Sequence, residues 1–182
     1  MMEQLIRRSL ISLHGFLVQG TWHGREREVV SLYAFGHLLP EMTANGMDPT
    51  QIGIEVAVPQ VPRENHRRKD PDVCKDLVIW PEPSMTTWKS ESEKGRFPSA
   101  ILEWKTRNNT LPRSSPDSLD RAFHENIDWL QQFANMAPEG WTGYAVSVDL
   151  ALETPWMRVA KVTHLEVTMD WLTLGSESGT SK

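Results

Sequence analysis

The sequence contains a single cysteine, Cys74, and no excess of basic residues. One cysteine excludes an intrachain disulfide, so nothing in the sequence requires an oxidising compartment and we expect a cytoplasmic location. Nineteen lysines and arginines stand against 24 aspartates and glutamates, which gives a formal net charge of −5. This balance argues against a protein that coats nucleic acid with its whole surface, but it is compatible with a local basic groove.

Long apolar runs are also missing. The apolar stretch 10–18 follows two arginines, as the core of a signal peptide does, but it is short and is interrupted by His14 and Gly15. Four apolar residues of this region recur instead at helical spacing and predict a surface helix with one buried face: Ile6, Leu10, Leu13 and Leu17. No segment approaches the roughly 18 apolar residues needed to cross a bilayer, so we expect no membrane partner.

The apolar content that is present favours one folded unit. A chain of 182 residues with 39% apolar residues can bury one sizeable core. We therefore predict one domain over residues 1–174 and a flexible tail at 175–182.

Hydrophobic periodicity and turn residues predict an α/β fold. After the opening helix, a second helix is expected over 25–39, ended by Pro40. Later segments are expected as three strands, a helix and a further strand: 52–58, 76–80, 100–106, 119–134 and 144–150. Residues 156–174 are expected to add one or two strands, and a helix is the alternative for the last eleven of them. The expected fold is a central mixed β-sheet flanked by helices, in the order α-α-β-β-β-α-β plus C-terminal strands.

Two of these strands carry charged residues in otherwise apolar surroundings. Glu103 and Lys105 are two residues apart in strand 100–106, so they share a face while Trp104 points to the other. Asp76 stands at the head of the apolar strand 76–80. Burying a charge is costly unless it is paired or bound to metal, so these residues point to a site.

If the two strands are neighbours, Asp76 and Glu103 can converge. Two carboxylates with a backbone carbonyl and waters suit a hard cation such as Mg²⁺ or Mn²⁺. Such an ion binds a phosphate oxygen and lowers the pKa of a bound water, while Lys105 could orient the attacking water. This set of groups is suited to phosphodiester hydrolysis.

At these residues the chain resembles the PD-(D/E)XK nuclease superfamily, whose motif is an acidic residue opening one strand and (D/E)-x-K on the next. The segments that match are 75–79 and 102–105, and the order of elements agrees over roughly residues 21–150. The resemblance implies a restriction-endonuclease-like fold and a magnesium-dependent DNA endonuclease. Asp76, Glu103 and the backbone carbonyl of Trp104 would bind metal, with Lys105 beside them.

A glutamate on the leading helix is a further expectation from the resemblance. Residues 25–30 look like the Glu-Arg-Glu-Leu run of archaeal Holliday-junction resolvases, and this favours Glu26 over Glu28 as a metal-binding catalytic residue. Lys75 stands where the family usually has proline, and Pro71-Asp72 offers a literal match inside a loop. No subfamily is assigned.

The remaining basic residues are candidates for nucleic-acid contact, although a solvated loop is the commoner outcome of such a run. They are Arg63, Arg67, Arg68, Lys69, Lys89 and Arg107. The expected partner is DNA, and RNA is an alternative. The sequence does not decide between a monomer, a homodimer and a larger protein complex.

Two simpler interpretations stand beside the nuclease. Glu103 and Lys105 could form an exposed pair on an edge strand, with Asp76 capping a turn. The chain could also be a catalytically silent nuclease-fold subunit that binds nucleic acid or a protein. Glu55 could join the site, although a surface role is the simpler one.

Overall fold

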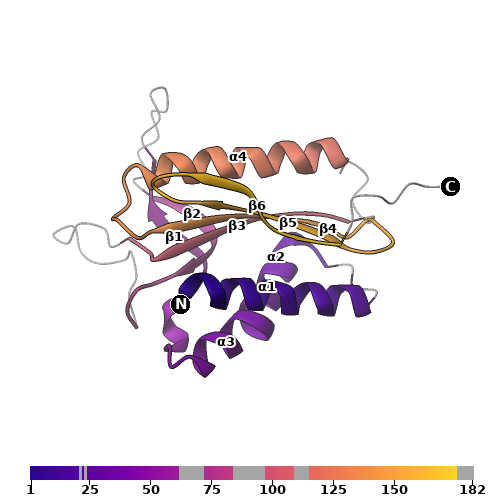
Figure 1. Ribbon diagram of the computed structural model, residues 1–182, viewed down its shortest axis with the longest axis horizontal. Coiled ribbons are helices and arrows are strands. Elements are labelled where there is room, and N and C mark those ends of the chain that lie inside the picture. Colours follow the sequence, from indigo (N-terminus) through magenta and orange to yellow (C-terminus); the bar gives the residue numbers. More distant parts are fainter. Residues whose placement is uncertain (21, 23, 62–71, 84–96, 109–114, 176–182) are drawn as a thin grey trace.

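A mixed six-stranded sheet forms the centre of the computed structural model, which describes residues 1–20, 22, 24–61, 72–83, 97–108 and 115–175 (Figure 1). The strands follow the order β1-β2-β3-β4-β5-β6. Their bounds are Ile52–Pro59, Asp72–Ile79, Ala100–Arg107, Thr142–Asp149, Trp156–Val162 and Val167–Leu174. Only β3 and β4 pair in parallel among the described strands, and the other neighbours are antiparallel. The expected α/β class with a mixed central sheet is confirmed.

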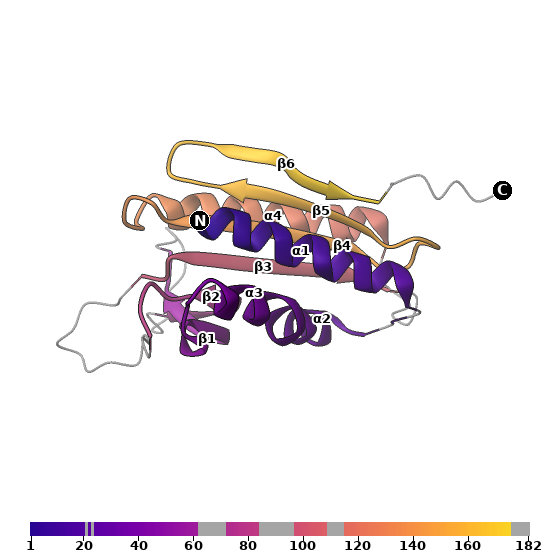
Figure 2. The same cartoon turned by 60° about the horizontal axis from the view of Figure 1, so that its bottom comes forward.

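Helices cover both faces of this sheet. On one face lie α1 (Met2–Gln19), α2 (Glu26–Leu32), a π-helical turn (Tyr33–Leu38) and α3 (Leu39–Ala44). The other face carries α4 (Pro116–Ala134), which connects the parallel strands β3 and β4 (Figures 1 and 2). Each layer has its own core: one cluster under α1 to α3 centres on Tyr33 and Trp104, and one under α4 centres on Phe123 and Phe133.

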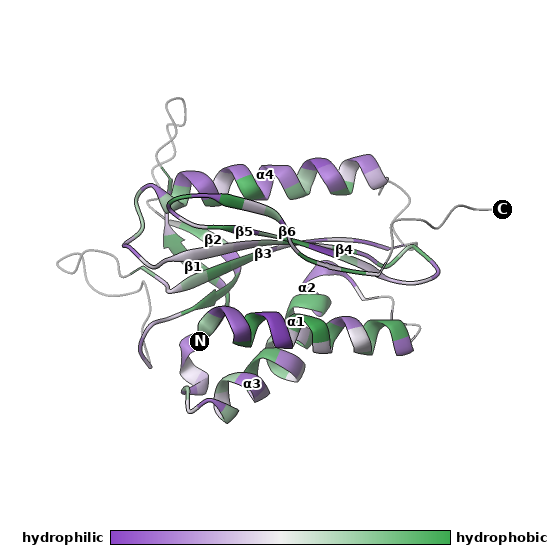
Figure 3. Ribbon diagram, viewed as in Figure 1, coloured by the Kyte–Doolittle hydropathy of each residue, from purple (hydrophilic) through white to green (hydrophobic). Residues whose placement is uncertain are grey.

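The two long helices are amphipathic. The residues expected on the buried face of the first helix, from Ile6 to Leu17, are fully buried in α1. In α4 the capping box at Ser115 sets the start, because its hydroxyl accepts a hydrogen bond from the backbone of Ser118. Figure 3 shows hydrophilic and hydrophobic residues alternating along both helices, as expected of helices with one buried face. Among the described residues, no helix is both long enough and apolar enough to cross a membrane.

The prediction that Pro40 ends the second helix is wrong. The chain passes through a π-helical turn, in which the Leu39 backbone N–H binds the carbonyl of Ala34. Pro40 follows as the second residue of α3 and has no N–H to donate, so the hydrogen-bond pattern changes at the π-helical turn instead of the helix ending. Helical structure therefore continues to Ala44.

One strand prediction needs correction and another is confirmed. β2 begins at Asp72 rather than at Asp76, because the second half of β1 pairs with residues 72–75, and this pairing outweighs their polar composition. The prediction of one or two strands over 156–174 is confirmed, because the segment forms β5 and β6, and the helical alternative for its last eleven residues is not adopted. The predicted tail beyond Gly175 lies outside the described residues.

Candidate active site

Asp76 lies where β2 and β3 separate. The ladder between the two strands runs from the pair Ile79–Ala100 to the pair Leu77–Leu102. Beyond it, a carboxylate oxygen of Asp76 accepts a hydrogen bond of 2.8 Å from the backbone N–H of Trp104. A side chain thus takes the place of a strand-to-strand bond and is held at the opening between the strands.

The partner strand β1 changes its orientation at the same level. Ile54 packs in the cluster under α1 to α3, whereas Val56, two residues later, packs in the cluster under α4. A regular strand keeps residues two apart on one face. The exception is located at Glu55, whose φ of 51° is in the left-handed region.

β2 shows the matching change at Asp76. Leu77 packs under α1 to α3, but Val73, four residues before it, packs under α4. Lys75 consequently extends toward α4, and its ammonium lies 3.4 Å from the centroid of the Trp129 ring. Asp76 is therefore an interior residue of β2 at a change of face, and not the head of the strand.

Glu103 is buried in the interior strand β3, with 6% of its surface exposed. The interpretation as an exposed edge-strand pair is therefore wrong. Lys75 Nζ lies 3.4 Å from Glu103 Oε1, close enough for an ion pair but without hydrogen-bond geometry, so this oxygen is buried without a hydrogen bond among the described residues. Burial raises the pKa of Glu103 to about 7, with Lys75 opposing the shift and Asp76 adding to it.

Lys105 is held by the helix α2. Its ammonium donates a hydrogen bond of 2.9 Å to Glu26 Oε1, and the second carboxylate oxygen of Glu26 accepts one from the backbone N–H of Thr106 at 3.1 Å. Burial lowers the pKa of Lys105, but the charge and hydrogen bond of Glu26, together with Asp76 and Glu103, outweigh it and raise the pKa above its usual value. Lys105 is accordingly a fixed cation at neutral pH.

The choice between Glu26 and Glu28 follows from the same contacts. Glu28 accepts a hydrogen bond from the backbone of Arg25 at the start of α2, which is a capping role. Glu26 instead faces β3. A cavity of about 70 Å³ lies beside it and is also lined by Asp76 and Glu55, which forms an exposed ion pair with Arg27.

The predicted nucleic-acid contacts divide into two groups. Arg107 is paired with Asp149 on the neighbouring strand, at 2.5 Å, and its side chain is mostly buried. The other five lie outside the described residues: Arg63, Arg67, Arg68, Lys69 and Lys89.

Comparison with known proteins gives no family for this chain. No protein-family model, curated protein or solved structure matches it. The chemistry of the site is therefore argued from its own residues.

The site offers oxygen atoms that a hard cation could use as ligands. Glu103 offers a buried oxygen without a hydrogen bond, and the Trp104 carbonyl points to the same side of β3 as its N–H, toward Asp76. In the described part of the chain, no three acidic, histidine or cysteine side chains converge as a ready ligand cluster. The candidate ligands of a cation at this place are the carboxylates of Asp76 and Glu103 and the carbonyl of Trp104.

Lys75 is the residue of the site that the sequence pattern did not reveal as a contributor. Lys75 stands where the resembled family has a proline, and regular alternation along β2 places it on the face opposite Glu103. The change of face at Asp76 brings the two together. β2 also contains the charged residues Asp72 and Asp76, so charge in this strand gave no signal that singled out Lys75.

Proposed function

We propose that this chain is a metal-dependent nuclease that hydrolyses phosphodiester bonds of DNA. The observation that carries the proposal is the buried Glu103 in an interior strand, next to the opening where Asp76 is held against Trp104. A carboxylate is costly to bury without compensation, and a bound cation would supply it. The helix-strand-strand-strand-helix-strand order, with β3 and β4 parallel, agrees with the resemblance to PD-(D/E)XK nucleases.

Each residue has a role in this proposal. Asp76, Glu103 and the carbonyl of Trp104 would hold Mg²⁺ or Mn²⁺, which when bound supplies Lewis-acid stabilisation of phosphate charge. Lys105 remains an ammonium and so orients the attacking water and offsets negative charge on the phosphate, rather than taking a proton. Glu26 positions Lys105 by hydrogen bonding both to its ammonium and to the next backbone N–H.

The test is nicking of supercoiled plasmid DNA by purified protein with Mn²⁺ or Mg²⁺. We expect Asp76→Asn and Lys105→Ala to reduce the rate by about a hundredfold or more, since each removes a charge from the reacting centre. Glu26→Gln keeps the shape of the side chain and is expected to reduce the nicking rate by a smaller factor. Matched controls are the exposed Asp170→Asn and the distant Lys161→Ala, which should leave the rate unchanged.

Equal nicking by the wild type and all variants would assign the activity to a contaminant and refute the proposal. Absence of cleavage by every protein would support a second candidate, a nuclease-fold subunit that binds without cutting. One observation favours that candidate: Lys75 already provides Glu103 with a buried positive charge. In such a protein the ammonium would replace the cation permanently.

A further inference from the structure

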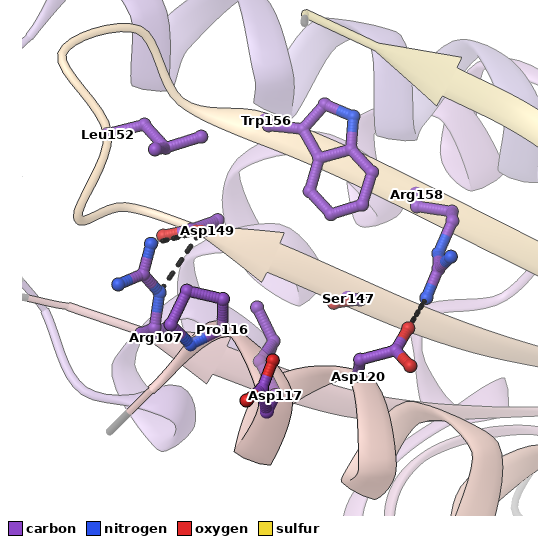
Figure 4. A pocket seen from close by; sticks show the side chains of 10 residues that line it. Arg107, Pro116, Asp117, Asp120, Ser147, Asp149, Leu152, Trp156 and Arg158 are labelled. Atoms are coloured by element: carbon purple, nitrogen blue, oxygen red, sulfur yellow. Dashed lines mark hydrogen bonds and ion pairs between the residues drawn. The ribbon is translucent and has the colours of Figure 1, made fainter. Parts of the chain in front are cut away.

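A larger cavity, of about 350 Å³, lies at the carboxyl ends of the parallel strands β3 and β4 (Figure 4). It is bounded by these strand ends, by β5 and by the first turn of α4. In α/β sheets this end of parallel strands is a common place for ligands. Glu26, Asp76 and Glu103 do not line it, so it is distinct from the candidate metal site.

The charges of this cavity are nearly balanced. Arg107 donates two hydrogen bonds to one oxygen of Asp149, and Arg158 donates one to Asp120, as the dashed lines in Figure 4 show. Asp117 is an additional carboxylate, in the first turn of α4, where the helix dipole stabilises it. With both guanidinium groups already paired, the cavity is poorly suited to a phosphate cluster.

Two polar atoms at the cavity have no hydrogen-bond partner among the described residues. They are the hydroxyl of Ser147, a fully buried residue, and the buried Nε of Arg158. Buried polar atoms in folded proteins are bonded in the great majority of cases. These two therefore mark hydrogen bonds that a ligand can supply, one to a hydroxyl and one from a guanidinium.

Planar groups form another part of the wall. The Trp156 ring projects into the cavity in Figure 4, and the guanidinium carbon of Arg158 lies 5.4 Å from its centroid. On its other side Arg158 packs 4.2 Å from the centroid of Phe123. Planar walls with both donors and acceptors suit a flat, uncharged heterocycle better than an aliphatic or a strongly charged ligand.

We propose that this cavity binds one nucleobase with its sugar, separated from its stacking neighbours. The volume is at the lower end of the range for ligand pockets and suits a ligand of nucleoside size. The chemistry is the same whether the nucleoside belongs to a nucleic-acid strand or to a free nucleotide.

Ser147 connects the cavity to the candidate active site, because it is the cross-strand partner of Lys105 in the β3–β4 ladder. Directly paired residues leave the sheet on the same face, and the Lys105 side chain then extends to Glu26 of α2. A strand with a base in the cavity would thus lie near the part of β3 from which Lys105 projects. This step rests on the proposed nuclease function, and it names the substrate as a strand with an unpaired or flipped-out nucleotide.

The test measures binding in EDTA, where no cleavage occurs. Isothermal titration calorimetry with the common deoxynucleoside monophosphates is compared with titration of a short single-stranded oligonucleotide and of a fully paired hairpin. We expect saturable binding of at least one monophosphate and of the single strand, with the hairpin at least about tenfold weaker. Monophosphate binding without oligonucleotide binding would support the cavity assignment with free nucleotide as its source.

Two variants examine the cavity itself. Ser147→Ala removes the buried hydroxyl and is expected to weaken binding about five- to tenfold, the effect of one hydrogen bond. Leu152→Trp fills the cavity and keeps all its polar groups, so it should abolish binding. Ser12→Ala, on α1 at the opposite face of the sheet, is the matched control and should bind as the wild type does. Thermal melting checks that each variant is folded.

Absence of binding by every nucleotide, or binding that neither cavity variant changes, would overturn the proposal. Binding of nucleotides in EDTA without nicking of DNA would support the cavity proposal and refute the nuclease proposal. Nicking of DNA without nucleotide binding at this cavity would support the nuclease proposal and refute the cavity proposal.

Discussion

Glu103 illustrates how a single residue can be explained by its environment. Its carboxylate is in the interior strand β3 beside Lys75, whose ammonium lies over the Trp129 ring, and its pKa of about 7 follows mainly from burial. Burial also lowers the pKa of Lys75, with Glu103 opposing that shift. Both partners are thus shifted toward their neutral forms, as expected of an ion pair that has lost much of its hydration.

This pKa predicts a pH-dependent stability in the absence of metal. The folded protein keeps a proton on Glu103 between its ordinary pKa of 4.5 and about 7, where the unfolded chain releases it. Because the folded state binds the extra proton, the free energy of unfolding decreases as pH rises through this interval, by at most about 3 kcal/mol.

Urea unfolding in EDTA between about pH 5 and about pH 8 measures this effect. Other groups titrate over the same range, so the difference between the wild type and Glu103→Gln is the quantity of interest. The glutamine cannot ionise, and its stability should vary less with pH. Parallel profiles of the two proteins would contradict the burial of an ionisable group at this position.

At the scale of the element, the strands and helices with regular patterns were predictable from the sequence. β3 begins with a continuous run of buried residues and α4 has buried apolar residues at helical spacing, so both could be predicted from local sequence. β2 was not predictable in full, because its first residues are polar and become a strand only by pairing with β1. The side on which Lys75 lies depends on the change of face at Asp76, which no single strand pattern contains.

Glu55 is the residue at which β1 changes face, and its backbone gives a prediction at this scale. A φ of 51° is unfavourable for a residue with a side chain, whereas glycine adopts it freely. We expect Glu55→Gly to raise the free energy of unfolding by about 0.5–1 kcal/mol, since the exposed ion pair with Arg27 contributes little.

Glu55→Val serves as the matched comparison, because a β-branched residue is particularly strained in this conformation and should destabilise by about 1–2 kcal/mol. Chemical denaturation of the two variants provides the measurement. If valine were tolerated as well as glycine, β1 would continue as a regular strand through residue 55, and the change of face would need another explanation.

At the scale of the whole molecule, the site depends on contacts between distant parts of the chain. Glu26 of α2 reaches Lys105 of β3, and Lys75 of β2 reaches Trp129 of α4. The sequence indicated which residues were unusual, since charges in apolar strands are rare. It did not indicate the pairing of Lys75 with Glu103, which depends on the change of face in β2, or of Arg107 with Asp149, which depends on the register of β3 against β4.

The competition between Lys75 and a cation for Glu103 gives a prediction about the whole fold. A ligand that binds the folded state alone stabilises it according to its concentration and dissociation constant. If the cation binds at Asp76 and Glu103, Mn²⁺ should raise the melting temperature of the wild type at about pH 8, and Asp76→Asn should lose most of the increase.

Lys75→Met separates the two functions considered above. Without its ammonium, the buried Glu103 lacks a partner, so the metal-free variant should be destabilised by about 3 kcal/mol or more. A cation would then restore the missing charge, and the increase in melting temperature with Mn²⁺ should exceed that of the wild type. Equal destabilisation with and without Mn²⁺ would instead mean that Lys75 is the permanent partner of Glu103, as expected of a protein that binds its target without cutting it.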